Sequence, residues 1–106
     1  MADLKPGASL PELQAYLAQI CLERGWNKDT PEQKFMLFIE EVGELAKAMR
    51  GQANLYTETA RPNNYALEEE FSDVLSYLLD LANVYHVDLE SAFRAKEAVN
   101  AQRQWN

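Results

Sequence analysis

The chain has 106 residues, of which 10 are basic and 17 acidic, so its net charge at neutral pH is −7. This length suits one domain, and we expect a single domain over residues 1–106. An acidic protein lacks the positive field that holds nucleic acid polymers, so binding to DNA or RNA is not expected. A small polyanion can still bind where metal ions supply the positive charge.

The sequence gives no reason to expect secretion or insertion into a membrane. Cys21 is the single cysteine, so no intramolecular disulfide can form, and the amino-terminal residues lack the apolar run of a signal peptide. No segment approaches the roughly 18 to 20 apolar residues needed to cross a bilayer. We therefore expect a cytoplasmic protein without membrane contact, in which Cys21 is a small core residue.

Apolar residues recur at spacings of three and four along four segments, a period that predicts helices. The first helix is expected over about residues 9–24 and ends at Gly25. The second helix follows Thr30, which can form a capping box with Gln33, and ends at Gly51. No segment reads convincingly as a strand.

The connection over residues 50–63 is irregular and long for a helix–helix loop, which is typical of functional or mobile loops. The third helix is expected from about Asn63 or Asn64. Its predicted buried stripe consists of Leu67, Phe71, Val74, Leu78, Ala82 and Tyr85. Asp88 is a suitable N-cap for a fourth helix that runs to about Trp105. We predict an all-α fold, an antiparallel four-helix bundle completed by oligomerisation, because short helices with broad stripes leave apolar surface to cover.

The candidate functional residues are carboxylates on the second and third helices. Glu41 and Glu44 are three residues apart, as are Glu70 and Asp73, so each pair lies on one helix face. Packing through the neighbouring apolar stripes would bring the pairs together. Carboxylates that close repel one another unless cations lie between them, and oxygen ligands favour Mg²⁺ or Mn²⁺. The lone His86 excludes a multi-histidine zinc site, and a di-iron Glu-x-x-His motif is absent.

A solvated acidic surface is the alternative interpretation, because glutamates are common on exposed helix faces and near helix starts. Two features weigh against it. The acids flank the apolar stripes, and no lysine or arginine lies three or four residues after Glu41, Glu70 or Asp73 to neutralise them.

The acid pairs stand within longer motifs, namely EEVGEL over residues 40–45, EEEFSDVLSYLLDLA over 68–82 and HVDLESAFRAKEAVNAQRQW over 86–105. Together these motifs resemble the MazG-like all-α nucleoside triphosphate pyrophosphohydrolases, with the dCTP pyrophosphatase branch the most similar. The resemblance covers roughly residues 26–105. That branch has a tryptophan where this chain has Arg50 and Gly51, and a histidine near the position of Leu17, so dCTP itself is not singled out.

The resemblance implies a Mg²⁺-dependent hydrolase, with Mn²⁺ as a substitute ion, that converts a (d)NTP to a (d)NMP and pyrophosphate. It also implies a homodimer or homotetramer and a role in cleaning the nucleotide pool. Glu41, Glu44, Glu70 and Asp73 match the family's metal ligands. Glu44, or Glu40 beside the cluster, is expected to take the proton from the attacking water.

Lys96, Asn100 and Arg103 match residues that meet the triphosphate, and their helical spacing of four and three predicts a shared face. Trp26 and Tyr77 match positions that contact the base in the dCTP branch. Two alternatives stay open. One is a dUTPase-like or phosphoribosyl-ATP-type hydrolase on the same scaffold, and the other is a non-catalytic helical dimer that binds nucleotide or a protein partner.

Overall fold

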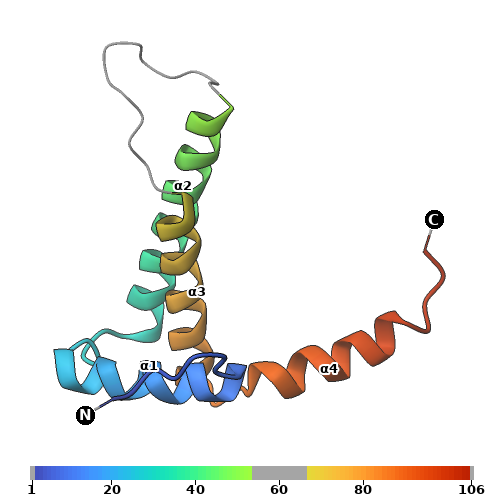
Figure 1. Ribbon diagram of the computed structural model, residues 1–106, viewed down its shortest axis with the longest axis horizontal. Helices are drawn as coiled ribbons and strands as arrows, with labels where there is room; N and C mark the ends of the chain where they lie inside the picture. Colours follow the sequence, from blue (N-terminus) through green and yellow to red (C-terminus); the bar gives the residue numbers. More distant parts are fainter. Residues whose placement is uncertain (1, 54–66, 106) are drawn as a thin grey trace. The chain divides into compact units, whose positions relative to one another are not determined.

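The computed structural model describes residues 2–53 and 67–105, and that part of the chain contains four helices and no strand (Figure 1). The helices are α1 over Leu10–Arg24, α2 over Pro31–Gln52, α3 over Leu67–Val84 and α4 over Leu89–Asn100. The predicted all-α class is thereby confirmed for the described residues. None of these helices combines the length and the apolar character that spanning a membrane requires.

The chain divides into two compact units, to both of which α3 contributes. The first unit comprises residues 1–28 and 79–106, and the second comprises residues 29–78. The placement of one unit relative to the other is not determined. The antiparallel bundle and its completion by oligomerisation therefore stay predictions.

Both α1 and α2 begin with a capping box. In α2 the predicted box is present, since Gln33 N donates to Thr30 Oγ1 at 3.1 Å and Thr30 N donates to Gln33 Oε1 at 2.9 Å. In α1, Glu12 N donates to Ser9 Oγ at 3.3 Å and Ser9 N donates to Glu12 Oε1 at 3.0 Å. Each box satisfies backbone donors that have no partner within the first helical turn.

The predicted helix ends agree less well with the structure than the predicted starts that can be compared. Gly25 ends α1 as predicted, in the left-handed conformation with φ 72° that glycine adopts without a steric penalty. The prediction that Gly51 ends α2 is wrong, because Gly51 keeps helical geometry and the helix continues to Gln52 with Ala53 as its C-cap. The predicted start of the third helix and most of the predicted 50–63 connection lie outside the described residues.

The fourth helix begins at its predicted cap, where Asp88 Oδ1 accepts a hydrogen bond of 2.9 Å from Ser91 N. It ends at Asn100, however, before the predicted end near Trp105. The last turn tightens, with Arg103 N donating to Asn100 O at 3.1 Å. Trp105 Nε1 donates to the same carbonyl at 2.9 Å, so an indole occupies the acceptor that a longer α-helix would use.

The first unit has a small apolar core around α1. Its buried members are Leu17, Ile20, Cys21 and Leu79, and the half-buried residues that pack against them include Leu13, Tyr16 and Leu89. The prediction that Cys21 is a core residue is confirmed. Its Sγ lies 3.9 Å from Asp80 Oδ1.

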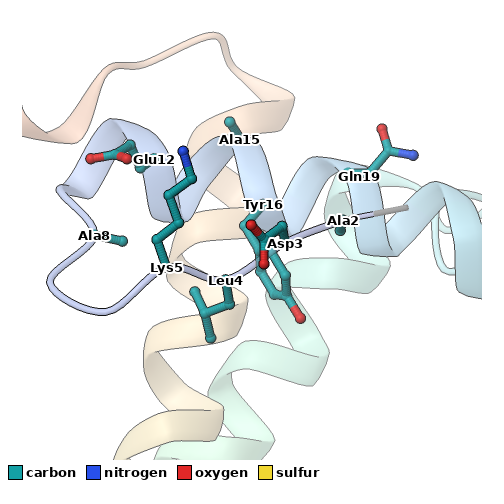
Figure 2. Close-up of a pocket in the computed structure, with 9 residues that line it drawn as sticks. All are labelled: Ala2, Asp3, Leu4, Lys5, Ala8, Glu12, Ala15, Tyr16 and Gln19. Atoms are coloured by element: carbon teal, nitrogen blue, oxygen red, sulfur yellow. The ribbon is translucent and has the colours of Figure 1, made fainter.

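A pocket of about 270 Å³ in the same unit lies between the amino-terminal segment and α1 (Figure 2). Its walls include Leu4, Lys5, Glu12 and Tyr16. None of the residues predicted to act in catalysis or binding lines it.

The apolar stripes of α2 and α3 are largely open in the single chain. The predicted burial of the third helix's stripe is wrong for Phe71, Leu78 and Tyr85, which are 54%, 41% and 65% exposed, although Ala82 is buried. Among the described residues of the second unit, the other exposed large apolar side chains are Phe35, Met36, Ile39, Val42, Met49 and Leu75, whereas Tyr85 belongs to the first unit.

Candidate metal centre

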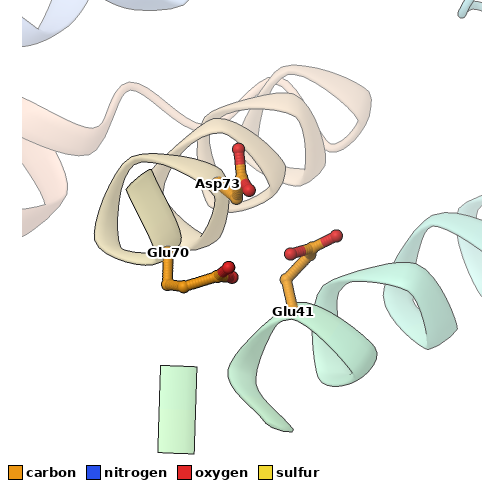
Figure 3. Close-up of side chains that lie close together, drawn as sticks. All are labelled: Glu41, Glu70 and Asp73. Carbon is orange, nitrogen blue, oxygen red and sulfur yellow. The ribbon is translucent and has the colours of Figure 1, made fainter. Parts of the chain in front are cut away.

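Three carboxylates from two helices meet in the second unit (Figure 3). Glu41 reaches from α2 toward Glu70 and Asp73 on α3, and one oxygen from each lies within 4.8 Å of the others. Glu41 and Glu70 are half-buried, whereas Asp73 is exposed. Three of the four predicted ligands therefore lie at one place, and that they hold a metal ion stays a prediction.

The electrostatics of this cluster follow from burial and crowding. The pKa of Glu41 is raised, first by burial and then by the charges of Asp73, Glu70, Glu40 and Glu44. The pKa of Glu70 is raised in the same way, by burial and then by Asp73, Glu44 and Glu69. Glu44 and Glu40 thus lie close enough to act on the cluster, although neither belongs to the group within 4.8 Å. Burial and mutual repulsion disfavour the charged form of these carboxylates, and a bound cation would offset that repulsion.

One oxygen of the cluster lacks a hydrogen-bond partner. Glu70 Oε2 is buried, and no described residue donates a hydrogen bond to it. A buried acceptor without a donor is costly, so an unpartnered oxygen beside two further carboxylates fits a cation better than it fits a packed protein interior. Three carboxylate oxygens form the kind of donor set that hard ions such as Mg²⁺ and Mn²⁺ prefer.

Two further predicted site residues belong to the same unit. Glu44 is half-buried and lies one turn after Glu41 on α2. Tyr77 is half-buried and lies one turn after Asp73 on α3, so it shares that helix face. Glu40, the expected auxiliary base, is exposed.

The remaining predicted residues belong to the first unit, and their distances from the carboxylates are not determined. Trp26 follows the end of α1, is 53% exposed, and has the Arg24 guanidinium carbon 4.9 Å from its ring centroid. Lys96 is exposed on α4, and Asn100 closes that helix with a buried Oδ1 that no described residue bonds. Arg103 lies in the tight turn after the end of α4, and a face shared with Lys96 and Asn100 stays a prediction.

The sequence pattern alone does not reveal a polar pair in the first unit, the buried Gln14 of α1 and the half-buried Asn83 of α3. Their side-chain amides are hydrogen-bonded, with Gln14 Nε2 donating to Asn83 Oδ1 at 3.1 Å. The available signal was the position of Gln14 on the apolar stripe of α1, four residues after Leu10 and three before Leu17.

Comparison with known proteins places this geometry in a family. The model of the MazG nucleotide pyrophosphohydrolase domain matches residues 29–102. The dATP/dGTP diphosphohydrolase of Cyanophage S-2L is 34% identical over 103 residues, which cover 92% of this chain and 79% of the phage protein. The dCTP pyrophosphatase 1 of Rattus norvegicus is 35% identical over 105 residues, which cover 95% of this chain and 62% of the rat protein. The chain thus spans about three-fifths of the length of that curated relative.

Solved structures agree with the sequence matches. The Cyanophage S-2L MazG-like pyrophosphohydrolase, bound to dGDP and three catalytic Mn²⁺ ions per active site, has a TM-score of 0.69 and 30% identity, covering 96% of this chain and 87% of its own. An iMazG from Vibrio DAT 722 has a TM-score of 0.62 and 33% identity, covering 88% of this chain and 94% of its own. The matched region includes α2, α3, α4 and all three clustered carboxylates. On these grounds the chain belongs to the MazG nucleotide pyrophosphohydrolase domain family.

Proposed function

We propose that this chain is a Mg²⁺-dependent pyrophosphohydrolase that converts a deoxynucleoside triphosphate to its monophosphate and pyrophosphate. The main support is the carboxylate cluster, in which Glu70 Oε2 is buried without a donor. Membership of the MazG domain family supports the reaction class. Two relatives are named for dCTP and for dATP and dGTP, so deoxynucleotides are the expected substrates and the preferred base is left to experiment.

The roles of the acidic residues follow from their positions. Glu41, Glu70 and Asp73 would hold the cation, with Glu44 as the fourth ligand from the next turn of α2. A bound divalent ion neutralises phosphate charge and lowers the pKa of water. Glu44, or Glu40 on the exposed side, would accept the proton of the attacking water. The Mn²⁺ ions of the cyanophage structure support Mn²⁺ as a substitute for Mg²⁺.

The first unit, together with Tyr77 of the second, would supply the groups that bind the nucleotide. Cleavage of a phosphoric anhydride needs charge neutralisation and alignment more than covalent help from the protein. Lys96, Asn100 and Arg103 would donate to the triphosphate, where charge builds up during the reaction. Trp26 and Tyr77 would contact the base, since aromatic rings stack on bases of every kind.

We further propose that the chain acts as a homodimer or homotetramer in the cytoplasm, where it would clean the nucleotide pool. The exposed apolar side chains of α2 and α3 support the assembly, because burying them against a second copy would remove a wide apolar surface from water.

The test is release of pyrophosphate and of the nucleoside monophosphate from the eight common NTPs and dNTPs, with and without Mg²⁺. Wild type, Glu41→Gln and Asp73→Asn are compared with Glu32→Gln, which removes the same charge from an exposed site in the first turn of α2. We expect Mg²⁺-dependent release that falls by roughly 100-fold or more in the first two variants and persists in the control.

Full activity in both cluster variants would contradict the proposed site. dUTP and phosphoribosyl-ATP are assayed beside the panel, and cleavage of either of these alone would favour a related hydrolase on the same scaffold. Absence of any release would favour a non-catalytic helical dimer, one that binds nucleotide if Mg²⁺ and nucleotide still raise the melting temperature and one that binds a protein partner if they do not.

A further inference from the structure

A buried glutamine joins α1 to the start of α4. Gln14 is 7% exposed, and its Nε2 donates to Val87 O at 2.8 Å and to Asn83 Oδ1 at 3.1 Å. Its Oε1 accepts from Leu89 N at 2.9 Å, and Asn83 Nδ2 donates back to the Gln14 carbonyl at 2.9 Å. One side-chain amide therefore uses both its donors and its acceptor to tie α1 to the α3–α4 turn and to the first residue of α4.

The rest of α4 has few attachments of its own. No described residue of this helix is buried, and its first residue, Leu89, is the one that packs against the core. Side-chain bonds farther along are local, such as the exposed pair of Arg94 and Glu90 at 3.4 Å. The direction of α4 within the first unit is therefore set at its amino-terminal end.

The turn before α4 needs such support. His86 has φ 56°, a left-handed conformation that is strained for a residue with a side chain. A strained residue of this kind persists where its surroundings fix it. Gln14 bonds the backbone at Val87 and Leu89, on either side of the cap residue Asp88. The glutamine thus holds the segment between the strained residue and the helix.

We propose that Gln14 is a positioning residue that sets the direction of α4 and thereby the places of Lys96 and Asn100. The inference rests on the proposed function, in which these two residues bind the triphosphate. At a rise of 1.5 Å per residue, Lys96 and Asn100 lie roughly 10 and 16 Å along the helix from Leu89. A tilt of about 10° at Leu89 moves Asn100 by about 3 Å, which is more than a hydrogen bond tolerates.

The first experiment does not depend on catalysis. Backbone hydrogen exchange is measured along α4 in wild type, in Gln14→Met, which keeps the length of the side chain and removes its hydrogen bonds, and in Gln19→Met. Gln19 is a matched control, an exposed glutamine on the same helix with a 3.4 Å bond to Glu23. We expect α4 amides to exchange at least about tenfold faster in Gln14→Met, with α2 unchanged. Unchanged exchange in α4 would overturn the proposal.

A second variant removes the donor of the hydrogen bond between Leu89 N and Gln14 Oε1. Leu89→Pro removes the N–H that donates to Gln14 Oε1, while proline suits the first position of a helix. Asp88, the residue before it, already has the extended geometry (ψ 111°) that proline requires of its predecessor. Because Leu89 also packs against the core, Leu89→Ala, which loses that side chain and keeps the N–H, is the control. If Gln14→Met fails to fold, faster exchange in Leu89→Pro than in Leu89→Ala still supports the proposal, and equal exchange in the two contradicts it.

The second experiment separates positioning from general destabilisation. Lys96→Ala is made in wild type and in Gln14→Met, and KM for the preferred dNTP is measured below the melting temperature of each variant. Loss of the lysine should raise KM about tenfold in wild type and less than about threefold in Gln14→Met, because Lys96 is already displaced there. Equal effects in both backgrounds would reduce Gln14 to a structural role. An inactive wild type with a loosened α4 in Gln14→Met would contradict the proposed function alone.

Discussion

Neutralising Glu41 should make the metal-free protein more stable and, at the same time, remove its stabilisation by Mg²⁺. Oxygens of Glu41 and Asp73 lie within 4.8 Å of each other. At that distance two unit charges repel by about 0.9 kcal/mol at a dielectric constant of about 80 and by about 3.5 kcal/mol at about 20. Because Asp73 is exposed, solvent screening favours the lower end, about 1 kcal/mol. For a domain of this size, that energy corresponds to a rise in melting temperature of about 4 to 8 °C.

The assay is thermal unfolding of wild type, Glu41→Gln and Glu32→Gln, first in EDTA and then with increasing Mg²⁺. In EDTA, Glu41→Gln should melt highest. Glu32→Gln should melt slightly below wild type, because Glu32 lies in the first turn of α2, where a negative charge is favourable. A hundredfold excess of Mg²⁺ over its dissociation constant should stabilise wild type by about 2.7 kcal/mol and Glu41→Gln far less.

Two results would refute this reasoning. A lower melting temperature for Glu41→Gln in EDTA would mean that the cluster is not repulsive in the metal-free protein. An equal gain from Mg²⁺ in Glu41→Gln and wild type would mean that Glu41 is not a ligand.

Further predictions concern pH, a helix cap and the core. Burial and neighbouring acids raise the folded-state pKa values of Glu41 and Glu70 above the ordinary 4.5, so the folded chain binds protons that the unfolded chain does not. The higher stability of Glu41→Gln relative to wild type in EDTA should therefore decrease as the pH falls from about 7 toward about 5. Urea midpoints measure this difference, and a difference that grows would contradict the raised pKa values. Thr30→Ala removes the side-chain half of the α2 capping box and should cost about 1 kcal/mol in urea unfolding, whereas an unchanged midpoint would show that the box adds nothing. Leu17→Ala, at a site 6% exposed, should cost about 2 to 5 kcal/mol by the same assay, and a loss below about 1 kcal/mol would show that the small core can collapse around the deletion.

The helix starts could be predicted from the sequence because their causes are local. The box at Thr30 joins residues three positions apart, and the cap at Asp88 does the same. The ends of α2 and α4 could not be predicted as well. Gly51 stays helical, and beyond Asn100 the indole of Trp105 reaches back to the Asn100 carbonyl. A helix end of that kind depends on side-chain geometry that spacing alone does not encode.

The candidate site was also predictable only where local spacing determines the structure. Spacing of three residues put Glu70 and Asp73 on one face, and the apolar stripes directed that face toward Glu41. The bonds from Gln14 to Asn83 and Leu89 span 69 and 75 positions in the chain, and periodicity carries no information over such distances. A glutamine on an apolar stripe indicates that a buried partner exists, but it does not identify the partner.

The positions of the two tryptophans have a practical consequence for spectroscopy. Trp26 and Trp105 are the only tryptophans in the chain, and both belong to the unit of residues 1–28 and 79–106. Tryptophan emission therefore reports on that unit alone, whereas circular dichroism reports on all four helices, including α2 in the other unit. If the two units melt separately, the fluorescence and dichroism transitions will not coincide. A free energy taken from tryptophan emission would then describe one unit, and one taken from dichroism would combine two transitions.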